Sequence, residues 1–186
     1  MGALSEYERE LPPNIKVSPI EPHQTLTQML YDGEIDALYT ARMPSSFLKG
    51  DGVVKRLFDN YQEVERQYYK DTSIFPIMHT VVIRREVYEA NRWIAQSLTK
   101  AFIQAQQMTY EALNETAALK TMLPHLTAHV EEVKREFGDD WWPYGLEKNV
   151  KTLETFTRYH HEQGLSPKRL QVEELFAPEA LEAFKI

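Results

Sequence analysis

The chain has 186 residues and a net charge of −7, from 21 basic and 28 acidic side chains. It contains no cysteine, which excludes disulfides, thiolate catalysis and cysteine-based metal sites. The acidic balance argues against a nucleic-acid-binding surface, because phosphates require a concentrated basic patch. No apolar run approaches the ~18 residues of a membrane span. This length predicts one compact domain or two small lobes.

The N-terminal part of the chain predicts alternating helix, strand and loop. Residues 15–17 are expected to be extended between prolines. Hydrophobic spacing and turn residues then predict four elements: a helix over residues 23–32 ended by Gly33, a strand over 35–40, a loop over 42–52 and a polar helix over 61–69.

Residues 77–83 are the most apolar strand candidate, with the sequence Ile-Met-His-Thr-Val-Val-Ile after Pro76. Such a run is typical of a strand buried on both faces, as in a parallel or mixed sheet. Two strands are too few for an independent sheet, so the pattern predicts part of a larger α/β protein. The rest is expected to be helical, with apolar stripes over residues 94–108, 126–137 and 146–156 and a short helix over 178–184.

Five motifs in this order resemble the C-terminal part of the 4,5-dihydroxyphthalate decarboxylase family. They are Gly-Glu-Ile-Asp-Ala at 33–37, Ile-Phe-Pro-Ile-Met-His at 74–79, Trp-Trp-Pro-Tyr-Gly at 141–145, Glu-Gln-Gly-Leu at 162–165 and Glu-Glu-Leu-Phe-Ala-Pro at 173–178. The first motif occurs in many solute-binding proteins, whereas the second and third together are specific. The likeness runs from about Pro12 to the last residue.

The resemblance implies an α/β chain, a partial two-lobed fold of the type 2 periplasmic-binding-protein kind, predominantly helical with a few strands. Residues 1–75 would belong to the second lobe and its cleft loop. Residues 76–186 would form a hinge-crossing strand and helices that pack on the first lobe. Family members carry a substantial portion before the point where this chain begins, so a truncated member, a gene fragment or half of a split protein is expected. A truncated sheet would leave an open strand edge, which predicts self-association.

The activity implied by the resemblance is non-oxidative decarboxylation of an aromatic dicarboxylate, 4,5-dihydroxyphthalate to protocatechuate, in a cleft between lobes. This chemistry needs a general acid for the ring carbon, a base for the phenol and cations for the remaining carboxylate. It demands no redox cofactor, and no cofactor is expected. The alternatives are a transporter's solute-binding protein for a small carboxylate, or an inactive truncated family member. The first residues do not resemble a secretory signal, so a cytoplasmic location is expected, or a periplasmic one if a leader lies upstream.

His79 is the predicted acid–base residue, because imidazole titrates near neutral pH and His79 lies in one of the two specific motifs. The alternative is a structural histidine that fixes the hinge. Arg42 is expected to bind a substrate carboxylate in a bidentate manner, with Ser45 and Ser46 adding hydroxyl groups. The alternative for Arg42 is a solvated loop arginine.

Arg84 is the second candidate for binding a carboxylate. Alternation along a strand places Arg84 and Arg85 on opposite faces, so at most one of them is expected to face a ligand. The alternative is a surface ion pair with a neighbouring glutamate, which contributes little stability. Trp141, Trp142 and Tyr144 are expected to stack on an aromatic ring, with Trp142 and Tyr144 as the binding candidates, or alternatively to anchor the connection between two helices.

Two histidine pairs complete the candidates. His125 and His129 have the i, i+4 spacing of metal ligands on one helix face, with Glu132 as a candidate third ligand. The sequence offers no companion site, so no metal site is expected. His160 and His161 are adjacent on a helix, and the spacing predicts one packed and one solvated side chain.

Overall fold

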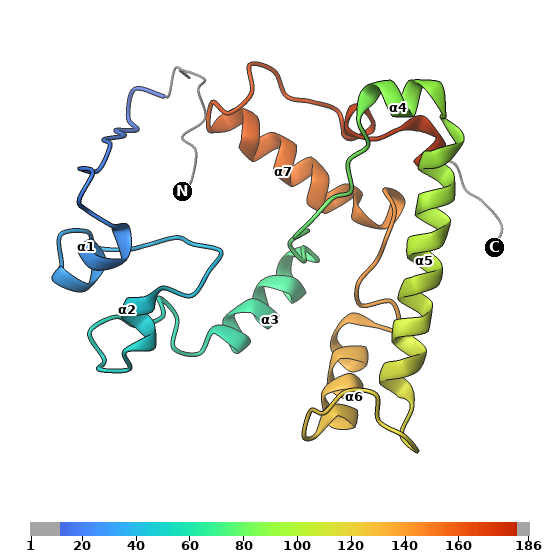
Figure 1. Cartoon of the computed structure of the whole chain (residues 1–186), viewed down its shortest axis with the longest axis horizontal. Coiled ribbons are helices and arrows are strands. Elements are labelled where there is room, and N and C mark those ends of the chain that lie inside the picture. Colours follow the sequence, from blue (N-terminus) through green and yellow to red (C-terminus); the bar gives the residue numbers. More distant parts are fainter. Residues whose placement is uncertain (1–11, 182–186) are drawn as a thin grey trace. The chain divides into compact units, whose positions relative to one another are not determined.

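The computed structural model describes residues 12–181, and all regular structure in this range is helical (Figure 1). No helix in this part of the chain is both long and apolar enough to cross a membrane. The α-helices are α1 (Leu26–Asp32), α2 (Ser45–Leu48), α3 (Tyr61–Thr72), α4 (Arg85–Ala90), α5 (Trp93–Asn114), α6 (Leu126–Phe137) and α7 (Val150–Glu162). Three 3-10 helices accompany them: η1 (Glu147–Asn149), η2 (Val172–Leu175) and η3 (Pro178–Ala180).

The described chain divides into two units, residues 12–68 and residues 69–181, with the boundary inside α3. In the first unit α1 contacts α2. Helix α1 begins after Thr25, whose side-chain oxygen accepts a hydrogen bond from the Gln28 backbone N–H at 3.3 Å. It ends at Gly33, whose φ of 76° is the left-handed conformation that glycine adopts without strain.

Polar and cation–π contacts join the helices of the first unit. The Tyr31 hydroxyl donates to Asp51 Oδ2 at 2.8 Å, and Lys49 Nζ lies 3.3 Å from the centre of the Tyr31 ring. Ser46 is the one buried residue among residues 12–68. Tyr31 therefore connects α1 to the residues that follow α2.

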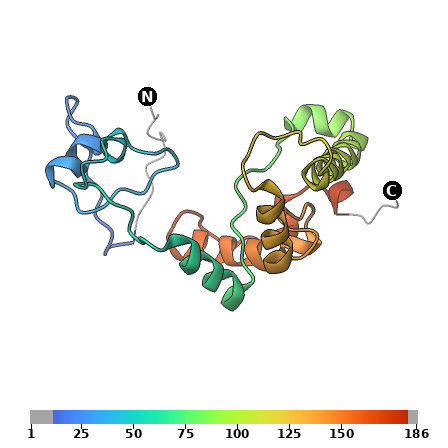
Figure 2. The ribbon, with the colours of Figure 1, turned by 90° about the horizontal axis from the view of Figure 1, so that it is seen from below.

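The second unit is built along α5, which is the longest helix. Helix α6 packs against α5 in both views (Figures 1 and 2), and η3 packs on α5 as well. Helix α7 contacts η1 and η2. The apolar stripes place hydrophobic side chains on the facing sides of these elements. The buried hydrophobic residues of the described chain are Ala95, Leu126, Val130, Leu153 and Val172.

A polar contact fixes η3 to the region where α4 meets α5. The Tyr88 hydroxyl donates to Glu179 Oε2 at 2.6 Å, and Arg92 Nη1 lies 3.3 Å from Glu179 Oε1. The Arg92 guanidinium also lies 5.3 Å from the centre of the Tyr88 ring. Side chains from α4, from the residue before α5 and from η3 thus form one network, which links segments 87 and 91 residues apart in the sequence.

The predicted α/β fold is wrong for the described residues, because none of them lies in a strand. Residues 35–40 are a bend and irregular chain, and residues 77–83 are irregular. A strand requires a neighbouring strand for its backbone hydrogen bonds, and a pair alone is marginal in water, so β-favouring composition is not sufficient. The open sheet edge predicted to drive self-association is therefore also absent from residues 12–181.

Local helical signals were better guides. The predicted helices over 23–32, 61–69, 94–108, 126–137 and 146–156 correspond to α1, α3, α5, α6 and α7. The predicted loop over 42–52 contains the single turn α2, and α4 was not predicted. The predicted helix over 178–184 is the 3-10 turn η3, and its last three residues lie outside the described range. The assignment of residues 1–75 and 76–186 to two lobes stays a prediction.

Removal of one buried side chain tests the packing of α7. Leu153→Ala is expected to lower the free energy of unfolding by about 2–5 kcal/mol, because it deletes buried methyl groups and leaves a cavity. Phe156→Ala deletes a larger side chain from the same helix, but Phe156 is 55% exposed, and its loss is expected to cost less than about 1 kcal/mol. Urea unfolding followed by circular dichroism measures both, and equal losses would contradict this packing.

The Tyr88–Glu179 contact predicts a pH-dependent contribution to stability. The hydrogen bond from Tyr88 is the main reason that the pKa of Glu179 lies below its ordinary value of 4.5. Because the pKa is lower in the folded state, the stabilisation is present above pH 4.5 and is lost as the pH falls through the folded-state pKa. Tyr88→Phe is therefore expected to lower Tm more at pH 7 than at pH 3, and the same loss at both would refute it.

Candidate functional site

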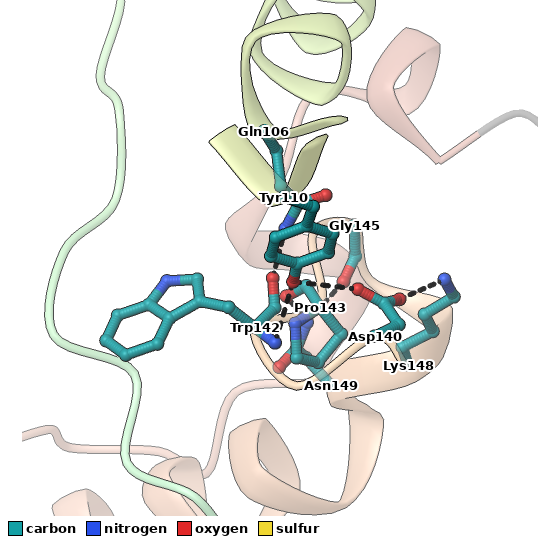
Figure 3. Close-up of polar contacts among 8 residues, drawn as sticks. All are labelled: Gln106, Tyr110, Asp140, Trp142, Pro143, Gly145, Lys148 and Asn149. Atoms are coloured by element: carbon teal, nitrogen blue, oxygen red, sulfur yellow. Dashed lines mark hydrogen bonds and ion pairs between the residues drawn. The ribbon is translucent and has the colours of Figure 1, made fainter. Parts of the chain in front are cut away.

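The loop between α6 and η1 carries the specific motif Trp-Trp-Pro-Tyr-Gly, here called the tryptophan loop (residues 141–145). Two side chains of α5 hold its backbone (Figure 3). Gln106 Nε2 donates to the Trp142 carbonyl oxygen, and the Trp142 backbone N–H donates to the Tyr110 hydroxyl at 3.0 Å. Both backbone polar groups of Trp142 are thus bonded to one helix.

The flanks of the tryptophan loop are fixed by two further residues. Asn149, at the start of α7, donates from Nδ2 to the carbonyl oxygens of Pro143 at 2.9 Å and of Gly145 at 2.8 Å. Asp140 accepts a hydrogen bond from the Tyr110 hydroxyl at 3.3 Å and forms an ion pair with Lys148. The loop therefore has hydrogen-bonding anchors before, within and after the motif.

Burial raises the pKa of Tyr110, and burial is the largest of the effects on this group. A raised pKa keeps the hydroxyl protonated near neutral pH. One hydroxyl donates a single hydrogen bond and accepts others, which matches its donation to Asp140 and its acceptance from the Trp142 N–H.

A row of four aromatic side chains, here called the ring cluster, connects the tryptophan loop to the chain before α4. Tyr69 and Phe137 have ring centres 4.3 Å apart, and Phe75 lies 5.6 Å from Phe137. The Phe75 and Trp142 rings are 5.3 Å apart in an edge-to-face arrangement. Phe75 belongs to the motif at 74–79, so this contact brings the two most specific motifs of the sequence together.

The motif at 74–79 begins the extended segment (residues 74–83), which runs between α3 and α4 without helix or turn (Figure 1). His79 lies near its middle and is exposed. Its imidazole makes no hydrogen bond, ion pair or ring contact with any residue in the described part of the chain. His79 is therefore not the packed hinge histidine that the sequence left as an alternative.

Arg84 ends the segment and Arg85 begins α4. Each forms a surface ion pair, Arg84 with Glu86 at 3.3 Å and Arg85 with Glu89 at 3.7 Å. These are the pairs that the sequence offered as the alternative to ligand binding. Both arginine side chains remain more than three-quarters exposed, at 78% and 84%, so the ion pairs leave both guanidinium groups accessible.

Trp142 and Tyr144 are 43% and 40% exposed, whereas their backbone is anchored. Trp141 packs on Tyr110, with ring centres 4.2 Å apart. Trp141 and the loop backbone thus anchor the helix connection. Stacking of the partly exposed Trp142 and Tyr144 on a ligand stays a prediction.

The other predicted binding residues lie in the unit of residues 12–68. Arg42 has an exposed side chain, and its backbone N–H donates to Thr40 Oγ1 at 3.2 Å. Ser45 is exposed at the start of α2. Ser46 is buried, and its hydroxyl has no hydrogen-bond partner among the described residues. Arg42 and Ser45 thus have accessible side chains, and Ser46 does not.

The remaining histidines show no sign of a metal centre. His125 lies before α6 in the left-handed region with φ of 60°, so it precedes the regular helix that carries His129. Within residues 12–181 no group of three or more His, Asp or Glu side chains is arranged to hold a metal ion. His160 packs beside Phe156 at 5.5 Å between ring centres, and His161 is exposed, as the spacing predicted.

Sequence reasoning missed three residues that assemble this site, namely Phe75, Gln106 and Tyr110. Phe75 was recognised only as part of a motif. Gln106 and Tyr110 are one turn apart on α5, and this i, i+4 spacing puts both on one helix face. A buried glutamine on a helix with apolar stripes was the available signal, because a buried amide needs a hydrogen-bond partner.

Comparison with known proteins identifies the relatives of this chain. No family model matches it. It is 36% identical over 183 residues to a 4,5-dihydroxyphthalate decarboxylase from Comamonas testosteroni. The match takes in 98% of this chain and 56% of that protein, so the chain spans about half the length of the curated relative that it matches. The resemblance predicted from the motifs is confirmed, because nearly the whole chain is similar to a portion of a 4,5-dihydroxyphthalate decarboxylase.

Proposed function

We propose that the chain serves in the non-oxidative decarboxylation of an aromatic dicarboxylate, with 4,5-dihydroxyphthalate as substrate and protocatechuate as product. The observation that carries the proposal is the Phe75–Trp142 contact, because it joins the two family-specific motifs in one place. The name of the relative supplies the substrate class. Partly exposed aromatic rings, the exposed imidazole of His79 and the exposed guanidinium of Arg84 are the groups that an aromatic diacid would need.

The reaction replaces a carboxylate on the ring by a proton. Removal of the proton from the hydroxyl para to the departing carboxylate pushes electron density onto the ring carbon that bears this carboxylate. That carbon then accepts a proton, which interrupts aromaticity. The bond to the carboxylate breaks, carbon dioxide leaves, and its electron pair returns to the ring while the phenol oxygen regains a proton. The net change is one proton taken up and one carbon dioxide released.

His79 is the proposed proton donor to the ring carbon. Imidazolium and imidazole coexist near neutral pH, so one side chain donates a proton and is recharged by solvent. The His79 ring is exposed and unengaged by other described residues, so a substrate can reach both of its nitrogens. A histidine with this access suits proton transfer better than one locked by a neighbouring carbonyl.

Trp142 and Phe75 are the proposed contact surface for the substrate ring. Their edge-to-face arrangement leaves each ring partly exposed, at 43% for Trp142 and 36% for Phe75. Offset or edge-to-face contact with a third aromatic ring contributes about 0.5–1.5 kcal/mol beyond area burial. Tyr144, from the same loop, adds a hydroxyl group that can bond to a substrate oxygen.

Arg84 is the proposed partner of the carboxylate that stays on the ring. A guanidinium binds a carboxylate through two parallel N–H donors, and this geometry is stronger than the single contact with Glu86 in a high-dielectric surface setting. Arg42, Ser45 and Ser46 stay predictions for carboxylate and hydroxyl binding, and of the three only Ser46 has a buried side chain.

Turnover by the purified chain tests the proposal. Incubation with 4,5-dihydroxyphthalate is expected to yield protocatechuate, followed by chromatography. His79→Ala is expected to reduce turnover at least about 100-fold with little change in Kd, because general acid catalysis contributes factors of about 10²–10⁴. His129→Ala, a change at an exposed histidine of α6, is the control and is expected to retain turnover. Intact substrate, or equal turnover in both variants, would refute the assigned role.

A pair of arginine variants tests the carboxylate contact. Arg84→Gln is expected to raise Kd for 4,5-dihydroxyphthalate about tenfold or more, since a charge-assisted hydrogen bond contributes about 1.5–3 kcal/mol. Arg85→Gln removes an adjacent arginine with a similar surface ion pair and is expected to change Kd less than about twofold. Isothermal titration calorimetry measures both. Loss of affinity in the Arg85 variant alone would reverse the assignment.

A further inference from the structure

We infer that Tyr110, assisted by Gln106, is a positioning residue that presents the Trp142 indole to the aromatic substrate. The inference deepens the proposed function and rests on it for the identity of the ligand. Neither side chain belongs to a family motif quoted above. Both bond to the backbone of Trp142, and they are assigned an indirect role through it.

Helix α5 fixes the backbone of Trp142 by hydrogen bonds to both its carbonyl oxygen and its N–H. Gln106 and Tyr110 are one helical turn apart and point to the same face. Gln106 bonds to the Trp142 carbonyl oxygen, and Tyr110 accepts from the Trp142 N–H at 3.0 Å. These two hydrogen bonds hold the Trp142 backbone against α5, and the indole projects away from Tyr110 (Figure 3).

The close-up shows the Trp142 indole on the side of the extended segment (Figure 3). Phe75, in that segment, contacts the indole edge-to-face. Trp141, the preceding residue, instead packs on the Tyr110 ring, with ring centres 4.2 Å apart. One tyrosine therefore uses its ring to hold Trp141 and its hydroxyl to hold the backbone of Trp142, so the two tryptophans have different tasks.

The position of Tyr110 is itself secured. Its hydroxyl donates to Asp140, whose other carboxylate oxygen pairs with Lys148. Gln106 is 9% exposed, so water has little access to its amide. Removal of its hydrogen-bond partner therefore costs more free energy than it would for an exposed amide. The hydroxyl of Tyr110 is thus the single atom that joins α5, Asp140 and the Trp142 backbone.

A double-mutant cycle separates positioning from general stability. Four proteins are compared: the wild type, Tyr110→Phe, Trp142→Ala and the double variant. If Tyr110 acts through Trp142, Tyr110→Phe raises Kd for 4,5-dihydroxyphthalate about five- to tenfold in the wild-type background. In the Trp142→Ala background the same change is expected to alter Kd less than about twofold, because the group being positioned is gone. Equal effects in both backgrounds would overturn the inference.

Failure of the diacid to bind would refute the proposed function but would not test the positioning role. Two measurements without ligand test that role directly. The Trp142 amide proton is bonded to the Tyr110 hydroxyl, so Tyr110→Phe is expected to speed its exchange with solvent by about tenfold or more. The near-ultraviolet circular dichroism that Trp142→Ala removes is expected to weaken in Tyr110→Phe. Tyr159→Phe, at an exposed tyrosine of α7, is the matched control and should leave both unchanged. Unaltered exchange and dichroism in Tyr110→Phe would overturn the positioning role.

Discussion

The bonding of the Trp142 backbone to α5 is the interaction on which the candidate site depends. Gln106 and Tyr110 use both polar groups of that residue, and the loop can then turn only one of its two tryptophans toward the extended segment. The Phe75–Trp142 contact follows from that orientation, and through it the two specific motifs meet. Asn149 and the Asp140–Lys148 pair limit the freedom of the flanks. Hydrogen bonds to the backbone of the tryptophan loop therefore hold the Trp142 ring beside Phe75.

Helices could be predicted from the sequence because their signals are local. Gly33 and Gly138 both have positive φ and end α1 and α6, where glycine is the residue with the least steric cost. The apolar spacing of α5, α6 and α7 depends only on neighbouring residues. The two strand predictions were wrong for the opposite reason. Apolar, β-branched composition over 77–83 describes the side chains, but strand formation requires a hydrogen-bonded neighbour that the described residues do not supply.

The candidate site could be predicted in part. The motifs singled out the tryptophan loop and the extended segment, which the structure brings into contact through Phe75 and Trp142, since motifs with aromatic residues and proline stand out without any knowledge of contacts. The pairing of Phe75 with Trp142 and the support from Gln106 and Tyr110 could not be derived, because these residues are 32 to 67 positions apart and meet only in the packed structure. The side-chain roles also divided more finely than the sequence indicated. Trp141 anchors and Trp142 is presented, although both stand in the same motif.

The most direct test of the account is whether the extended segment and the tryptophan loop bind one ligand together. Nuclear magnetic resonance titration with 4,5-dihydroxyphthalate follows the Trp142 indole N–H and the His79 ring protons in the same sample. A shared site predicts that both signals shift and that both give the same Kd, while the Trp93 indole signal, from an exposed residue at the start of α5, does not move. Shifts confined to one of the two motifs, or different Kd values for them, would contradict a shared site.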